Sequence, residues 1–255
     1  MKRFPFPFLI AFALYMLIPS SAFSQDISTV MREGDVLWGE RKIVDKAKAA
    51  LDTYKKVLEV DTNNYEACWK IARAYFYLGD LLPETKEMRD QHKELGWEGM
   101  GYAKRALELN PQGIEGHYYY ALTLAQYSIG ISIIKALAKG LGPEYEKHIG
   151  EALKTNKLYD NAGPLRAMGR YWYQLPWPKR NIKKSISYLK DAVAYAPTTI
   201  RGYVYLAESY LEGGEKKLAQ ECLQKASALP ADITQEADRE RWRESAKVLS
   251  WISQV

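Results

Sequence analysis

The feature that most constrains the fold of this chain is a two-helix pattern that recurs after 34 residues. Residues 163–197 read as two antiparallel helices, because small residues stand where two backbones must approach closely and Pro197 ends the second helix. Residues 198–230 repeat the pattern, and Ala226 falls 34 residues after Ala192. Hairpins that repeat at such a period stack on one another and share a continuous core. The sequence therefore predicts an all-α solenoid.

The same register extends back towards the N-terminus. An Ala-Leu or Ala-Val pair closes the second helix of each copy, at Ala106, Ala152 and Ala192, with a weak candidate at Val57. The 34-residue unit is the tetratricopeptide period, and longer spacings between the earlier pairs indicate insertions. We predict about five tetratricopeptide hairpins, the first degenerate, with a C-terminal capping helix. The expected repeats lie near residues 31–64, 65–111, 112–157, 158–197 and 198–231, and the expected cap at residues 233–253.

The N-terminus has the pattern of a secretory signal peptide. A basic start precedes a short apolar run over residues 4–18, and small residues follow it. We predict a signal peptide at residues 1–24, cleavage before Gln25, and an exported, periplasmic domain of residues 25–255. An uncleaved N-terminal anchor is the alternative. No cysteine stands near the predicted cleavage point for lipid attachment.

Composition and spacing argue against several classes of function. The chain has 36 Lys and Arg against 31 Asp and Glu, without a basic run or nucleic-acid motif, so no nucleic-acid partner is expected. Cys68 and Cys222 fall three hairpins apart, beyond the reach of a disulfide. His92, His117 and His148 fall singly, without metal-site spacing, and no nucleophile has a matched base. We expect no metal, no cofactor and no enzyme activity.

The third repeat contains the most apolar insertion. Its first helix is predicted to continue from about Gly116 to Leu141 as one helix of about 25 residues. The extension from Ile129 onwards must be covered, because large exposed apolar patches are rare on monomers. It packs either inside the monomer, against the insertion at residues 81–96 or the loop of Trp177, or against another subunit or a partner. The sequence leaves both alternatives open.

The repeat register also predicts which side chains line a binding groove. In tetratricopeptide hairpins the first helix of each repeat faces the concave surface, which is the binding surface of solenoids. In this chain the groove positions carry four arginines with aromatic neighbours. The predicted site for a ligand or partner consists of Trp69, Arg73, Tyr118, Arg166, Arg170 and Tyr173.

Arg166 and Arg170 are the central pair of this predicted site. They stand four residues apart on one helical face, so that their guanidinium groups can converge on one anion. A carboxylate or phosphate suits such a pair, and flanking aromatic rings suit an apolar portion of the ligand. The alternative is that Glu66, Glu115 and Glu208 neutralise the arginines across adjacent repeats and hold the solenoid together.

Several segments resemble a group of exported bacterial tetratricopeptide proteins. The most specific is residues 163–178, Gly-Pro-Leu-Arg-Ala-Met-Gly-Arg-Tyr-Trp-Tyr-Gln-Leu-Pro-Trp-Pro, and the likeness spans about residues 97–229. The group is related to the T component that accompanies TRAP-type transporters, and a weaker likeness runs to the regulator of microtubule dynamics family. The first resemblance implies a periplasmic protein that binds a solute-binding or transporter subunit and holds an organic acid. The T component is typically a lipoprotein. This chain departs from that pattern, because it has no cysteine at the predicted cleavage site.

These observations together predict a non-catalytic exported binding protein whose concave groove holds a protein partner or an anionic organic ligand. The alternative is a structural scaffold of an envelope protein complex without a small ligand, which the apolar segment at residues 129–141 favours. Membrane contact is expected only through partners, and oligomer formation stays open.

Overall fold

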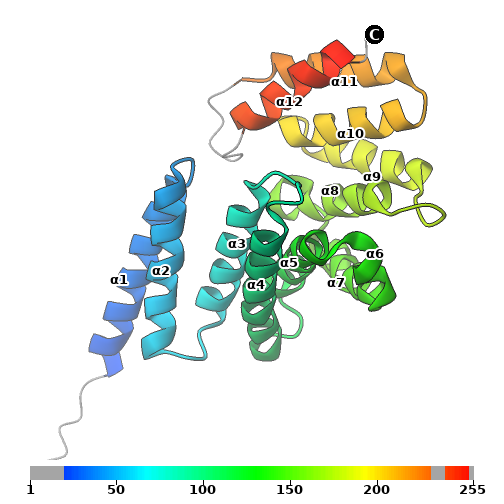
Figure 1. Ribbon diagram of the computed structural model, residues 1–255. Coiled ribbons are helices and arrows are strands. Elements are labelled where there is room, and N and C mark those ends of the chain that lie inside the picture. Colours follow the sequence, from blue (N-terminus) through cyan, green and yellow to red (C-terminus); the bar gives the residue numbers. More distant parts are fainter. Residues whose placement is uncertain (1–19, 231–238, 253–255) are drawn as a thin grey trace, which may run out of the picture.

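The computed structural model describes the backbone of residues 20–230 and 239–252, and the side chains of residues 27–230 and 240–250. Within these residues the chain forms twelve α-helices and no β-strand (Figure 1). The predicted signal peptide lies mostly outside the described residues, and the first helix begins at Ser20. None of the described helices is both long enough and apolar enough to cross a membrane.

Ten of the described helices pair into five hairpins. The pairs are α1 (Ser20–Gly39) with α2 (Val44–Val60), α3 (Tyr65–Asp80) with α4 (Arg89–Leu109), α5 (Ile114–Ile131) with α7 (Leu141–Asn156), α8 (Tyr159–Gln174) with α9 (Ile182–Tyr195), and α10 (Ile200–Glu212) with α11 (Lys216–Ala228). The hairpins follow one another from α1–α2 at the left of Figure 1 to α10–α11 at its upper right. The last helix, α12 (Arg239–Ile252), packs against α10 and α11 as a cap. The predicted tetratricopeptide solenoid is confirmed.

Small residues let the paired helices approach closely. Ser185 of α9 is buried and donates a 2.8 Å hydrogen bond to the backbone carbonyl of Gly169 in α8. A Cβ atom at Gly169 would lie only 2.5 Å from Leu189, so a larger residue does not fit there. The alanines that mark the repeat are buried as well: Ala106, Ala152, Ala192 and Ala226. The 34-residue pattern thus marks the contact line between helices.

The insertion at residues 81–96 packs inside the monomer, against the end of α5. A Cβ atom at Gly96 of α4 would lie 2.3 Å from the backbone nitrogen of Tyr127, so the two helices touch backbone to backbone. Trp97 and Tyr127 place their ring centroids 5.8 Å apart beside this crossing. Of the alternatives that the sequence left open, intramolecular packing accounts for this insertion.

The single long helix predicted for the third repeat is wrong. The chain breaks at Ser132, whose φ of 75° and ψ of 140° are not helical, and then forms the short α6 (Ile133–Ala138). The break turns part of the apolar segment back towards the solenoid, whereas Ile134 stays 70% exposed. Ile133 and Leu137 consequently line a cavity on the inner side of the solenoid.

Candidate functional site

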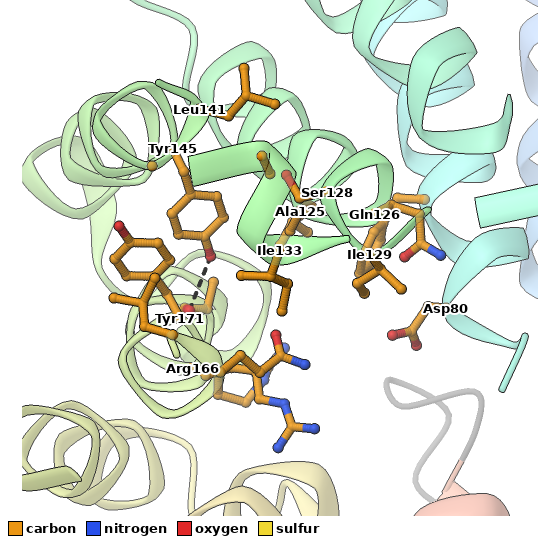
Figure 2. A pocket seen from close by; sticks show the side chains of 18 of the residues that line it. Asp80, Ala125, Gln126, Ser128, Ile129, Ile133, Leu141, Tyr145, Arg166 and Tyr171 are labelled. Carbon is orange, nitrogen blue, oxygen red and sulfur yellow. Dashed lines mark hydrogen bonds between the residues drawn. The ribbon is translucent and has the colours of Figure 1, made fainter. Parts of the chain in front are cut away.

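A cavity of about 160 Å³ lies on the concave side of the solenoid. Side chains of α5 and α6 form one wall and those of α8 the facing wall, while α3 and α10 contribute from the sides. Figure 2 shows Ile129 and Ile133 on one side of the cavity and Arg166 on the other. The lining combines apolar groups, Phe76, Leu122, Ile129, Ile133, Leu137 and Leu141, with charged ones, Asp80, Glu84, Asp160, Arg166, Arg170 and Arg201.

Tyr145 forms an aromatic wall at one end of the cavity. Its hydroxyl donates a 3.0 Å hydrogen bond from α7 to the carbonyl of Ala167 in α8 (Figure 2). Its ring stacks on Tyr171 with centroids 4.8 Å apart. Burial raises the pKa of the Tyr145 hydroxyl, so this group remains a hydrogen-bond donor. The bulky side chain of Tyr145 therefore shapes the cavity.

A left-handed turn at the start of α8 positions Asp160. Asp160, Asn161 and Ala162 have φ angles of 50°, 54° and 58°, in a region that costs roughly 1–2 kcal/mol per residue. The hydroxyl of Tyr118 donates a 2.8 Å hydrogen bond to the Asp160 carboxylate. Arg166 donates to the backbone carbonyls of Asp160, at 3.1 Å, and of Asn161. Because strained backbone concentrates at functional sites, this turn marks the cavity as a candidate site.

Each arginine of the cavity lies beside a carboxylate. The shortest distances between charged atoms are 3.6 Å for Arg166 and Asp160, 2.5 Å for Arg170 and Glu208, and 2.6 Å for Arg201 and Asp80. Glu208 therefore neutralises Arg170 of the adjacent repeat, as in the alternative to an open pair of arginines. Glu66 instead pairs with Lys70 at 2.7 Å, and Glu115 accepts a 2.8 Å hydrogen bond from Tyr65. The predicted fork is a set of ion pairs.

Arg170 also contacts two aromatic rings. Its guanidinium lies 4.5 Å from the ring centroid of Tyr205 and 5.0 Å from that of Tyr173. Burial raises the pKa of the Glu208 carboxyl, while the charge of Arg170 opposes this rise. Arg170 thus stabilises the ionised form of Glu208. An anion that competes with Glu208 would bind a guanidinium that the two rings already hold in position.

The structure separates the six predicted site residues into two groups. Tyr118, Arg166 and Arg170 line the cavity, and Tyr173 contacts Arg170 at its edge. Trp69 and Arg73 lie outside the cavity lining. There the guanidinium of Arg73 lies 4.1 Å from the ring centroid of Trp38 and 5.0 Å from that of Trp69. These two residues form a cation–π cluster between the first two repeats.

Reasoning from the sequence missed Asp80, the last residue of α3. Its carboxylate pairs with Arg201 of α10 at 2.6 Å and with Arg241 of α12 at 2.8 Å. These partners stand 121 and 161 residues further along the chain, where no repeat period signals a contact. The second repeat therefore touches the fifth repeat and the cap, beside the cavity that Asp80 also lines.

His117 and His148 lie together, although each falls singly in the sequence. Their Nδ1 atoms are 2.9 Å apart, and Nε2 of His117 is 2.9 Å from the carbonyl oxygen of Pro111. His117 therefore donates through Nε2 and accepts from His148 at Nδ1. Burial and the neighbouring His117 lower the pKa of His148 to about 4. Among the described residues no group of three or more His, Cys, Asp or Glu is placed to hold a metal ion.

Both cysteines are free and buried, as predicted. Burial raises the pKa of Cys68 and that of Cys222 to about 11, so each thiol remains protonated at neutral pH. Neither residue lines the cavity. The cysteines are therefore small helix residues of the core.

Solved structures of similar shape agree with the tetratricopeptide fold. The crystal structure of TTC0263, a thermophilic TPR protein of Thermus thermophilus, has a TM-score of 0.63 and 20% sequence identity, covering 86% of this chain and 98% of that chain. The structure of PilF from Pseudomonas aeruginosa has a TM-score of 0.56 and 11% identity, covering 89% and 90%. At these identities the likeness concerns the fold alone.

Sequence relatives of this chain are regulators of microtubule dynamics. Regulator of microtubule dynamics protein 1 of Pongo abelii is 26% identical over 265 residues, which cover 96% of this chain and 80% of the relative. The Mus musculus protein of the same name is 26% identical over 95% of this chain and 81% of its own length. The Homo sapiens protein is 27% identical over 73% of this chain and 62% of its length.

These relatives correct the predicted location. They are mammalian proteins, and a periplasm belongs to the bacterial envelope, so the prediction of an exported periplasmic protein is wrong. The resemblance to the T component of TRAP-type transporters, on which that location partly rested, has no support here. The likeness that the sequence ranked second is the one that the comparisons bear out.

The family match covers most of the chain. The family model described as regulator of microtubule dynamics protein 1-3 matches residues 30–253. This range includes all six predicted site residues and every residue that lines the cavity. The chain therefore belongs to the regulator of microtubule dynamics protein 1-3 family.

Proposed function

We propose that this chain is a non-catalytic scaffold, with residues 25–255 acting as one solenoid domain, and that its concave groove binds a segment of a partner protein. The observation that carries this proposal is the cavity between α5, α6 and α8. Concave solenoid surfaces are where repeat proteins bind extended partners. A volume of about 160 Å³ suits one apolar side chain of the partner, because a cavity of about 150 Å³ accommodates benzene.

The charges around the cavity favour a partner segment with an acidic group beside its apolar side chain. Arg170 is held by two aromatic rings independently of Glu208. A partner carboxylate can therefore replace Glu208 without any displacement of the guanidinium. Burial already disfavours ionised Glu208, which lowers the free-energy cost of that exchange.

Site-specific photo-crosslinking tests where the partner binds. Ala125 lines the cavity and is half-buried, whereas Ala194 is exposed on α9. A benzophenone amino acid at position 125 is expected to crosslink a protein partner in cells, and the same group at position 194 is the control. Equal crosslinking from both positions would show that the concave groove is not the binding surface.

Removal of one ion pair tests the acidic part of the partner. Arg170→Gln combined with Glu208→Gln leaves no unpaired charge, so the fold is expected to keep its stability within about 1 kcal/mol. Binding of the crosslinked partner segment is expected to weaken roughly tenfold, since a charge-assisted hydrogen bond is lost. Ala125→Trp, which fills the cavity, is expected to weaken binding as well. Full affinity in both variants would contradict the proposal.

A small anionic organic ligand is the second candidate, favoured by the same combination of apolar walls and arginines. Trifluoromethylbenzoate is a suitable probe, because its ring is close to the cavity size and its carboxylate suits Arg170. ¹⁹F NMR is expected to show binding that Ala125→Trp removes. If the wild-type chain leaves the ¹⁹F signal unchanged, the small-ligand candidate falls and the protein segment remains.

The name of the mammalian relatives supports a partner in the microtubule system. We extend regulation of microtubule dynamics to this chain as part of the proposal. Co-sedimentation with assembled microtubules, and their growth rate in its presence, test this role. Wild-type protein is expected to change the growth rate and Ala125→Trp to lose part of the effect; no effect of the wild-type protein would contradict the role.

A further inference from the structure

The loop between α8 and α9 presents an unusually exposed aromatic side chain. Trp177 is 88% exposed, more than any other large hydrophobic side chain among the described residues. It stands between Pro176 and Pro178, whose fixed φ angles limit its backbone. The loop between α8 and α9 lies at the edge of the molecule in Figure 1.

The sequence around this tryptophan is basic. Between residues 161 and 190 the sequence has seven Lys or Arg and no Asp or Glu. Lys179 and Lys183 are exposed, and neither forms an ion pair within the part of the chain that the structure describes. Arg180 pairs with Glu212 of the next hairpin at 2.6 Å. The loop therefore combines an exposed apolar group with unneutralised positive charge.

A second exposed apolar side chain stands in α6. Ile134 of α6 is 70% exposed, and Lys135 follows it. Its neighbour Ile133 lines the same cavity as Leu175, which stands two residues before Trp177. Each of the two exposed apolar side chains thus stands one or two residues from a residue that lines the cavity, with a lysine nearby in the sequence. We call Ile134, Lys135, Trp177, Lys179 and Lys183 the rim patch.

We propose that the rim patch docks on an anionic lipid membrane. Tryptophan favours the interface between water and lipid, and lysines next to it attract anionic headgroups. Two separate protruding tips suit insertion between lipids, whereas a folded protein partner needs a continuous complementary surface. The proposal goes beyond the protein-binding groove, and it departs from the expectation that membrane contact occurs only through partners.

Vesicle binding by the full chain tests the charged part of the patch. Wild-type protein is expected to bind phosphatidylcholine vesicles that contain phosphatidylserine, and added salt weakens this binding. Lys179→Glu with Lys183→Glu is expected to reduce it roughly tenfold or more. The matched control is Lys216→Glu with Lys217→Glu, two exposed lysines of α11. The apolar residues 4–18 are present in every variant, so differences between variants report on the patch.

Fluorescence quenching by brominated lipid tests insertion of the loop. Trp177→Phe is expected to remove most of the quenching, because Trp177 is the residue that meets the acyl region. Trp97→Phe is the matched control, since Trp97 is 61% exposed but lies on α4, away from the patch. Quenching that stays unchanged in Trp177→Phe overturns the proposal.

Two further outcomes would also overturn the proposal that the rim patch docks on an anionic membrane. Equal vesicle binding by the wild-type chain and the Lys179→Glu, Lys183→Glu variant means that the patch does not attract the membrane. Binding to polyglutamate without binding to phosphatidylserine vesicles assigns the patch to an acidic protein surface instead. The groove variants of the previous section do not touch the patch, so failure of one proposal leaves the other intact.

Discussion

At the scale of single residues, Arg166, which the sequence predicts to contact an anion, also holds the backbone. Its guanidinium caps two carbonyls of the left-handed turn and lies 3.6 Å from the Asp160 carboxylate. The sequence indicates the face on which Arg166 lies. It does not indicate the left-handed turn whose carbonyls accept hydrogen bonds from Arg166, because that turn is not part of the repeat. Arg170, one helical turn later, remains the better candidate for anion contact.

Arg166→Ala is expected to lower the free energy of unfolding by about 2 kcal/mol, because two carbonyls and a carboxylate lose a charged donor. Lys154→Ala is the control, since Lys154 forms an exposed ion pair with Glu151. Such a pair contributes little to stability. Urea denaturation followed by circular dichroism measures both variants. Equal losses would mean that Arg166 does not stabilise the turn.

His148 makes the stability of the fold depend on pH. Its pKa is about 4 in the folded chain, below the ordinary value of 6.5, because burial and His117 disfavour its charge. Between these values the unfolded chain binds a proton that the folded chain does not, so stability falls as pH drops from about 6.5 towards 4.

We expect about 1 kcal/mol of this loss at pH 5, after allowance for the partial exposure of His148. His148→Gln is the comparison, because glutamine keeps a donor for His117 but does not titrate. The difference in unfolding free energy between wild type and variant, measured from pH 7 to pH 5, isolates the contribution of His148. A difference that does not change with pH contradicts the prediction.

At the scale of helices, the crossing of α4 and α5 depends on glycine where the sequence showed only a polar insertion. The backbones touch at Gly96, beside Tyr127. The break at Ser132 then ends α5 and returns part of the apolar segment to the cavity. Helical periodicity continues through Ser132, which is why it predicted one long helix.

Gly96→Ala and Gly101→Ala are expected to have opposite effects, although both lie in α4. A methyl group at position 96 would stand 2.3 Å from the Tyr127 nitrogen, whereas at position 101 nothing lies within 4 Å. We expect Gly96→Ala to destabilise the fold by about 2–3 kcal/mol, and Gly101→Ala to stabilise it by about 0.5–1 kcal/mol. Thermal denaturation of the two variants checks the signs. Similar effects at both positions would contradict the close crossing.

At the scale of the whole molecule, Asp80 connects the second hairpin to the fifth and to the cap. Its two arginine partners come from α10 and α12, so the solenoid is tied across its concave side. Gln174 and Glu84 add a weaker contact of 3.3 Å between α8 and the insertion. The cap is therefore more than a solvating end, because it also holds the curvature around the cavity.

Asp80→Ala is expected to open the solenoid, since it leaves Arg201 and Arg241 without this carboxylate. Small-angle X-ray scattering should show a larger radius of gyration, and hydrogen exchange should be faster in α12. Asp45→Ala is the control, because the Asp45 side chain is 90% exposed. An unchanged scattering profile for Asp80→Ala would contradict a role for Asp80 in the curvature.

The sequence by itself determined the repeat, the five hairpins, the free cysteines and the small residues between paired helices. These features follow from contacts within a hairpin or between neighbours, which a 34-residue period records directly. It also placed Tyr118, Arg166 and Arg170 on one face, which the cavity brings together. Family membership was shown by a match over residues 30–253, whereas the local segments alone gave this family as the weaker of two resemblances.

Only the tertiary structure decided what that face contains. The left-handed turn at Asp160, the break at Ser132 and the contacts of Asp80 depend on residues that are distant in the chain or on single non-helical φ angles. Contacts between distant residues and single non-helical φ angles leave no periodic signal in the sequence. The arginines acquire carboxylate partners because burial without them would be too costly, and which carboxylate reaches each arginine is a matter of three-dimensional packing.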